Sequence, residues 1–372
     1  MKKILFLLIL PFILYAQEEP STPPAPPKPP APTAKPVDPN VRGPWTIQNN
    51  LHESPQQIEA ELDAAESQFN RAKEMFNPWY TGPLLTPSAS MMPPGYGNFQ
   101  PYIYMIGNYA HYDKNREAQS LPHNLYQFIS QNIVQFGITD TMDIITIPLA
   151  EGQWQDDQSG GGFGDLPITL GFPMVKQSLY VPQMKFSVQE TFPTGRYQNL
   201  NKNGLALSGI GGGAYQTQFS IALSKILFWT TKHPVNTRIF FSYKIPTSVH
   251  VKGFNVYGGG FGTHGKVKPG NTFSTDLGIE VSLSQPWVAA LDIAYTASNA
   301  THFHGYPGVT ATGAPATVGS PYNDNLSVAP GLEYNWNENL GIVFGAWFSV
   351  YGRESLAFVQ GIFSVCWTFP VD

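Results

Sequence analysis

The stretch 272-TFSTDLGIEVSLSQPWVAALDIAYTAS-298 contains two runs in which apolar and polar residues alternate. In the first run every second residue from Phe273 to Leu283 is apolar or threonine, and after Ser-Gln-Pro the alternation resumes from Trp287 to Tyr295. Successive side chains of a β-strand point to opposite faces, so the pattern predicts two strands joined by a tight turn. Taken alone, it leaves open whether the apolar face meets a partner sheet or lipid.

The composition narrows the class of protein. Charged residues make up 13% of the 372 residues, about half of the share usual in soluble proteins, and aromatic residues also reach 13%. The net charge of −5 gives no polybasic footprint, so a nucleic-acid partner is not expected. Few charges and many aromatics are typical of a β-barrel membrane protein, in which alternation dilutes the apolar residues. A large secreted β-protein has a similar composition.

The N-terminal region predicts export from the cytoplasm. Lys2 and Lys3 precede an apolar run that ends near Ala16, which indicates a cleaved secretory signal peptide over residues 1–16. Residues 17–44 are rich in proline and predict an extended, disordered spacer. The single cysteine, Cys366, excludes an intrachain disulfide.

One amphipathic helix is expected inside a periplasmic lead-in over residues 45–95. Ser54, Pro55 and Gln57 form a capping box with proline in the first turn. An apolar seam with heptad spacing follows, consisting of Ile58, Leu62, Ala65, Phe69, Ala72 and Phe76. The helix has three possible positions: on the end of a barrel, inside its lumen as a plug, or against a sister helix.

From about residue 99 the period of two continues to the C-terminus, which predicts a barrel domain over residues 96–372. The expected strands number twelve: 99–112, 124–137, 142–150, 164–175, 183–192, 213–227, 237–250, 271–284, 287–298, 325–336, 340–351 and 356–369. Connections after even-numbered strands are short, such as Ser-Gln-Pro, whereas most others are long, such as 151–162, 251–270 and 299–324. This alternation favours an antiparallel outer-membrane barrel with short periplasmic turns and long external loops.

Aromatic residues at the short-turn end predict a membrane-interface girdle. Such a girdle places amphipathic rings at the headgroup level. The expected members are Trp229, Trp287, Trp336, Trp367 and Phe369. The last of them ends a strand with alternating aromatics that resembles the C-terminal signal read by the barrel assembly machinery, although three residues follow it.

Strand parity also predicts which side chains face the lumen. Turning basic residues toward lipid near the midplane costs about 2–4 kcal/mol each, so polar side chains are expected inside. The inward set includes Lys185, Gln189, Gln216, Gln218, Arg238, Lys244, Asp276, Glu280, Asp292 and Glu333, together with Asp165 and Asn335.

No motif indicates an enzyme or a cofactor. Gly260, Gly265 and Lys266 have phosphate-loop spacing, but Val267 stands where serine or threonine is needed and the segment lies in a β–β loop. His302 and His304 share one side of an extended segment, yet no cysteine or nearby acid completes a metal site. A scattered triad drawn from the loop residues His250, His264, Asp156, Asp157 and Ser159 forms no recognisable local motif.

Four consecutive segments resemble a known family. They are 137-GITDTMDIITIPL-149, 163-FGDLPITLGF-172, 188-VQETFPTGRY-197 and 214-AYQTQFSIALSK-225. In this order they resemble the "MetA-pathway of phenol degradation" family of outer-membrane barrels, over roughly residues 99–369. The resemblance implies a channel or transporter for small molecules, including hydrophobic or aromatic compounds.

The sequence therefore predicts an outer-membrane barrel of about twelve strands that passes a small-molecule permeant and contacts outer-membrane lipid. The alternatives are a surface barrel whose external loops bind a host or neighbouring cell without transport, a soluble secreted β-protein, and, last, an outer-membrane enzyme. The oligomeric state stays open.

One pair of substitutions tests the predicted inside and outside. Ile279→Arg puts a charge toward lipid and is expected to impair assembly much more than Glu280→Gln, which alters a lumen residue. Heat-modifiable migration on gels reports the folded fraction of each variant. Equal damage from both changes would show that the two faces are assigned wrongly.

Overall fold

A computed structural model describes residues 54–75, 79–201, 206–229 and 231–371. The predicted signal peptide (1–16) and proline-rich spacer (17–44) lie outside the described residues.

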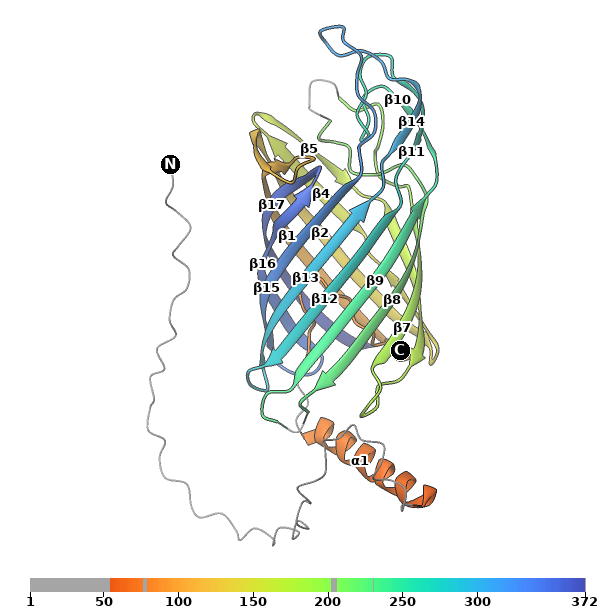
Figure 1. The fold of residues 1–372 in the computed structure, drawn as a ribbon, viewed down its shortest axis with the longest axis vertical. Coiled ribbons are helices and arrows are strands. Elements are labelled where there is room, and N and C mark those ends of the chain that lie inside the picture. The colour runs from red at the N-terminus through yellow and green to blue at the C-terminus, as the bar shows by residue number, and fades with distance from the viewer. Residues whose placement is uncertain (1–53, 76–78, 202–205, 230, 372) are drawn as a thin grey trace, which may run out of the picture. The chain divides into compact units, whose positions relative to one another are not determined.

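Twelve antiparallel wall strands form a closed barrel (Figure 1). Two of these twelve are each interrupted once, so that β3 and β4 together form one wall strand and β5 and β6 together form another. In chain order the wall consists of β1 (Tyr96–Tyr112), β2 (Ala118–Thr139), β3 (Met142–Thr146) with β4 (Leu149–Gln155), β5 (Gln158–Phe163) with β6 (Leu166–Val175), β7 (Gln183–Phe192), β8 (Gln216–Leu227), β9 (Val235–Pro246), β12 (Thr272–Ser282), β13 (Trp287–Ser298), β15 (Asn323–Asn335), β16 (Leu340–Arg353) and β17 (Ser355–Pro370). Each predicted strand falls on one of these, so the predicted twelve-stranded barrel is confirmed.

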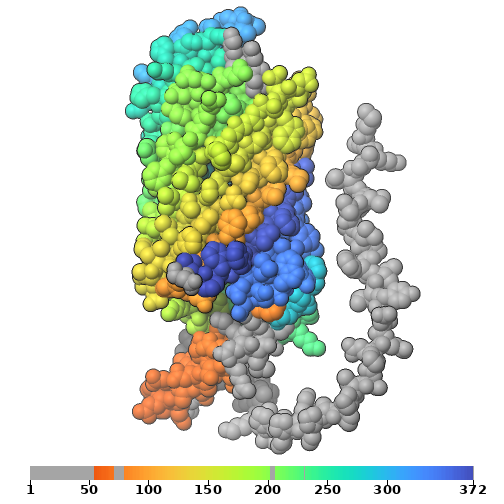
Figure 2. Space-filling model, turned by 180° about the vertical axis from the view of Figure 1, so that it is seen from behind, coloured from red at the N-terminus to blue at the C-terminus, as the bar shows by residue number. Residues whose placement is uncertain are grey.

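The first and last strands close the barrel. β1 pairs with β17 from Tyr96 opposite Pro370 to Tyr112 opposite Ser355, and its other edge pairs with β2. In Figure 2 the blue side chains of the C-terminal strands lie against the orange ones of the first strand. Closure pairs the two edges that an open sheet would leave free.

The two faces of the wall differ in polarity, as alternation requires. Along β17 the large apolar residues Val359, Phe363 and Trp367 are exposed on the outside. Along β12 the outward Phe273 is exposed, while Glu280 is fully buried on the opposite face. A continuous outer belt of apolar side chains surrounds a polar interior, the reverse of a soluble protein.

The connections differ from the predicted loops in two places. The stretch 151–162 is a hairpin, because β4 and β5 continue pairing beyond the barrel up to a turn at Asp156 and Asp157. The segments 251–270 and 299–324 contain part of a second sheet of three short strands, β10 (Val249–Lys252), β11 (His264–Lys268) and β14 (His302–Tyr306). Polar loop composition hid this pairing, since the strands are only four or five residues long.

The helix α1 (Pro55–Met75) begins directly after Ser54, as the capping box predicts. Phe69 is fully buried and meets the Trp229 ring edge-on, with 5.3 Å between ring centroids. The carboxylate of Glu66 accepts a hydrogen bond from the backbone N–H of Leu179, at 2.9 Å. Of the three possible positions, the helix therefore takes the one on the short-turn end of the barrel.

No helix in the described part of the chain is both long and apolar enough to cross a membrane.

Candidate functional site

Residues 80–92, named the plug segment here, lie inside the barrel lumen. They belong to the stretch 45–95 that was expected to be entirely periplasmic, so the structure corrects this part of the prediction. Tyr80 donates a hydrogen bond to the carbonyl of Pro234 (3.3 Å), and the N–H of Met92 donates to Asp143 (3.3 Å). Both partners stand at the short-turn end of the wall, so the segment enters and leaves the lumen at the same end.

Two fully buried carboxylates of the wall hold the backbone of the plug segment. Asp292 accepts hydrogen bonds from the N–H groups of Leu85 (3.2 Å) and Thr86 (3.0 Å) and from the Thr86 hydroxyl (2.6 Å). Glu333 accepts from the N–H groups of Thr81 (2.8 Å) and Gly82 (3.3 Å). These contacts take the place of water around the two buried carboxyl groups.

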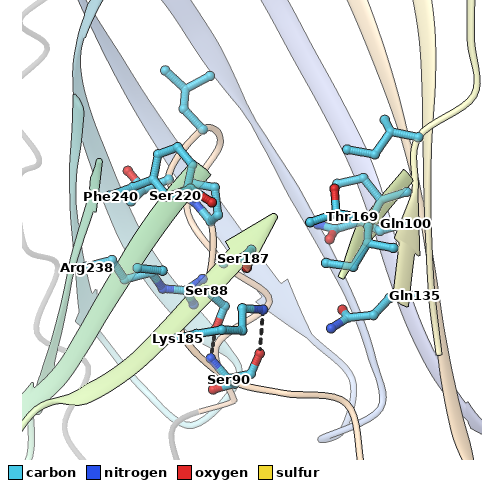
Figure 3. A pocket seen from close by; sticks show the side chains of 18 of the residues that line it. Ser88, Ser90, Gln100, Gln135, Thr169, Lys185, Ser187, Ser220, Arg238 and Phe240 are labelled. Carbon is cyan, nitrogen blue, oxygen red and sulfur yellow. Dashed lines mark hydrogen bonds between the residues drawn. The ribbon is translucent and has the colours of Figure 1, made fainter. Parts of the chain in front are cut away.

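A third attachment lies where the plug segment leaves the lumen. The Lys185 ammonium donates to the carbonyl of Ser90 at 3.0 Å (Figure 3). The same ammonium lies 3.7 Å from the Asp143 carboxylate. Asp143 also accepts from the Gln135 amide at 2.6 Å. The lysine thus joins a buried acid on one strand to the backbone of the plug.

Arg238 and Glu280 form a buried ion pair next to the plug. Two guanidinium nitrogens donate to the two carboxylate oxygens at 2.7 and 3.0 Å, and Asn236 donates to the same carboxylate at 2.7 Å. Gly82 has a φ of +119° and a Cβ there would lie 3.2 Å from the Arg238 guanidinium. Glycine is therefore needed for both the backbone conformation and the close approach.

Inward-facing glycines of the wall make room for the plug segment. A Cβ on Gly278 would come within 3.0 Å of Pro83 and Thr86, and one on Gly331 would come within 3.0 Å of Leu84. Leu84 itself is buried and packs inside the lumen against wall residues of β1, β15, β16 and β17, namely Tyr102, Tyr104, Ala329, Val343 and Ile362. Leu84 therefore holds this part of the plug against four neighbouring wall strands.

Cavities remain beside the plug. The central one, about 370 Å³, lies between the plug and the wall, with Gln100, Gln135 and Thr169 across it from Ser220 and Phe240 (Figure 3). A cavity of about 400 Å³ toward the short-turn end shares several lining residues with it, including Gln100, Gln135 and Arg238. A cavity of about 560 Å³ toward the long-loop end shares others, including Tyr102, Gln218 and Phe240. The three cavities form a series along the plug.

A smaller cavity of about 220 Å³ lies at the long-loop end and is lined by Gln216, Lys244 and Tyr257. The phenol of Tyr257 donates to the carbonyl of Gly212 at 2.6 Å. Burial, with a smaller effect from nearby Asp165 and Tyr197, raises the pKa of Tyr257 to about 12. The phenol therefore remains a hydrogen-bond donor at neutral pH.

The structure places the expected lumen residues in three groups. Lys185, Gln189, Gln218, Arg238 and Asp276 line the cavities beside the plug, and Gln216 and Lys244 line the one at the long-loop end. Glu280, Asp292 and Glu333 are fully buried in the contacts described above. Asn335 accepts from the Thr81 hydroxyl at 2.5 Å, whereas Asp165 binds the backbone N–H groups of Gly195 and Gly212 in the long-loop region.

The expected girdle residues occupy two kinds of environment. Trp287, Trp336 and Trp367 are about half exposed at the short-turn end, and their rings contact Tyr334 or Phe369. Trp229 instead packs against the helix residue Phe69. Trp229 therefore differs from the other three tryptophans in contacting the helix.

Sequence reasoning missed the plug segment because residues 80–92 show neither a helical nor a strand period. A signal was present in the wall, where Gly278 and Gly331 occupy inward positions without a side chain. Glycine inside a strand often marks a close approach of another backbone.

The motifs considered for chemistry lie apart from the lumen. Gly265 and Lys266 belong to β11, and the segment leads into a strand rather than a helix. Asp156 pairs with His123 at 2.9 Å. No group of three or more histidine, cysteine or acidic side chains in the described ranges has the arrangement needed to hold a metal ion.

Comparison with known proteins identifies the fold. No family model matches the chain, and no curated protein sequence matches it. An outer-membrane channel from Pseudomonas putida F1 superposes with a TM-score of 0.59 at 12% identity, covering 77% of this chain and 100% of that one. The translocator domain of the autotransporter NalP from Neisseria meningitidis has a TM-score of 0.41 at 11% identity, covering 84% and 98%. A mutant of the TodX monoaromatic hydrocarbon channel has a TM-score of 0.39 at 11% identity, covering 75% of this chain and 91% of that one. The chain has the fold of an outer-membrane β-barrel.

A substitution that fills the glycine space should dislodge the plug. In Gly278→Val the new side chain overlaps Pro83 and Thr86, and overpacking of this kind costs about 1–3 kcal/mol, enough to expose the plug roughly tenfold more often. The measurement is the rate at which a water-soluble maleimide labels Ser88→Cys in a Cys366→Ser background. Gly361→Val serves as control because a Cβ there meets nothing within 4 Å. Unchanged labelling in a folded Gly278→Val barrel would contradict the packing argument.

Proposed function

We propose that the protein is an outer-membrane channel for small molecules, narrowed by the plug segment. The observation that carries this proposal is the series of cavities that runs beside the plug inside a closed barrel. An eight-stranded barrel is filled by its own side chains. This twelve-stranded barrel encloses more space, and a separate segment of chain occupies part of it.

The outer surface supports a membrane location. Phe241, Tyr243 and Ile245 on β9, like Val359 and Phe363 on β17, are exposed on the outside of the wall. An exposed belt of apolar side chains is unfavourable in water and favourable against acyl chains. A closed barrel also leaves no strand edge unpaired, which a lipid environment requires.

The lining of the central cavity supports a class of permeant. Ile133, Ile145 and Phe240 present apolar surface, and serine, threonine and glutamine side chains present hydrogen-bonding groups. The two cations that line it are each matched by a buried acid, Arg238 by Glu280 and Lys185 by Asp143. Such a lining suits small molecules with an apolar body and a few polar groups, including aromatic compounds.

The attachment of the plug supports a movable obstruction. It is held by hydrogen bonds and packing, and Asp292 and Glu333 supply the acceptors for four backbone N–H groups. A typical hydrogen bond within a protein contributes about 0.5–1.5 kcal/mol. The wall strands do not depend on these contacts for their own pairing, so the plug is able to shift while the barrel stays closed.

Removing the two acceptors should increase conductance. Asp292→Ala with Glu333→Ala leaves four N–H groups of the plug without their acceptors, which favours displacement and raises planar-bilayer conductance at least about twofold. Replacing residues 80–92 by a glycine-serine linker of equal length should act in the same direction. Asp157→Asn, on an exposed turn, is the control and should conduct like the unaltered protein. If the linker variant folds yet conducts nothing, the protein is not a channel.

A further inference from the structure

The short strands β10, β11 and β14 extend the barrel wall beyond its long-loop end. β10 follows β9 after two residues, β11 precedes β12 by three, and β14 follows β13 after three. The order β10-β11-β14 in the small sheet repeats the order β9-β12-β13 in the wall. Figure 1 shows the three short strands above the ends of these wall strands. They are called the cap sheet below.

One face of the cap sheet points over the lumen. Val249, Val251 and Val267 are buried on this face and pack with Ala214 and Tyr257. Ala214 and Tyr257 also line the cavity at the long-loop end, beside the inward residues Gln216 and Lys244. The opposite face of the cap sheet is therefore turned away from the barrel axis, toward the side on which the wall carries its apolar belt.

The outward face carries only basic, histidine and tyrosine side chains at its paired positions. All are exposed: His250 and Lys252 on β10, His264, Lys266 and Lys268 on β11, and His302, His304 and Tyr306 on β14. Across the strands they form rows, with His250 opposite Lys266 and Lys266 opposite His304. Two strand spacings of about 4.8 Å and four residues of about 3.3 Å give this face a size of roughly 10 by 13 Å.

No acid offsets these charges within the same segments. Residues 247–275 and 297–323 contain three lysines, four histidines and no aspartate or glutamate. The two segments have a net charge of +3, and the whole chain has a net charge of −5, so the rest of the chain has a net charge of −8. No ion pair found in the described ranges involves Lys252, Lys266 or Lys268. Lys266 lies two residues from Lys268 on β11 and diagonally across from Lys252 on β10, so an anion bound between the three ammonium groups would relieve their mutual repulsion.

The position of this face just beyond the apolar belt indicates which class of anion it binds. His250 is five residues beyond the outward-facing Ile245, at most about 17 Å of extended chain. Residues 247 and 248, between β9 and β10, are not part of a strand and interrupt the alternation that would otherwise turn His250 inward. Headgroups begin where the acyl region ends, and basic side chains at that level attract anionic lipids. We propose that the cap sheet binds the phosphate groups of the anionic glycolipid that surrounds the barrel in the outer leaflet.

Lipid binding by the full-length protein tests this assignment. Native mass spectrometry of the barrel released from neutral detergent, with diphosphoryl lipid A added as probe, measures the affinity and the number of bound lipids. Lys252→Gln with Lys266→Gln and Lys268→Gln is expected to bind at least about tenfold more weakly. Lys114→Gln with Lys176→Gln and Lys232→Gln removes the same charge from exposed positions in other connections and should bind like the unaltered protein.

Raising the salt from about 0.05 to about 0.5 M should weaken binding, because the face is exposed to solvent.

Several outcomes would overturn the assignment. The variant with Lys252, Lys266 and Lys268 replaced is first shown to be folded by heat-modifiable migration. If it binds diphosphoryl lipid A as tightly as the control variant, the cap sheet is not the binding site. Equal binding of lipid A without phosphates would exclude phosphate recognition. Competition by inorganic phosphate at matched concentration would indicate a site for free anions, and preferential binding of a soluble acidic polysaccharide would indicate a partner other than the membrane. Each readout is independent of conductance.

Discussion

The pairing of β1 with β17 is the constraint on which the rest of the structure depends. It joins residues some 240 to 275 positions apart, and it turns a sheet with two free edges into a wall with none. Once the wall is closed, alternation along each strand assigns every side chain to the inside or the outside. The apolar belt and the polar lumen are both consequences of that closure.

The lumen of this barrel is organised by a second segment of chain. Asp292 and Glu333 are fully buried, and N–H groups of the plug donate hydrogen bonds to them in place of water. The wall contributes glycine at Gly278 and Gly331, where any side chain would occupy the same space. Leu84 packs the plug against an apolar patch of the wall, and cavities remain beside the plug. The obstruction and the cavities therefore share one lumen.

The cap sheet applies the same alternation outside the barrel. Its valines pack over the loops above the lumen, while its lysines and histidines are turned outward. Aspartate and glutamate occur in other connections at the long-loop end, such as those with Asp113 and Asp157, and are absent from the two segments that build the cap. Charge is therefore segregated around the rim, which gives the protein one basic flank on an otherwise acidic chain.

The sequence by itself determined the strands, because a period of two is a local property that each strand carries in its own residues. All twelve expected strands are present, and α1 begins where Ser54 and Pro55 predict. The inside and outside of the wall follow from the same period, as Phe273 and Glu280 show.

Only the tertiary structure decided where the plug, the cap and the helix lie. Thr86 meets Asp292 across 206 positions of sequence, and nothing in the composition of residues 80–92 points to that partner. The pairing of β11 with β14 and the contact of Phe69 with Trp229 likewise join distant segments. Such contacts depend on the shape and the unpaired groups that the closed barrel presents, and these exist only after the wall has formed.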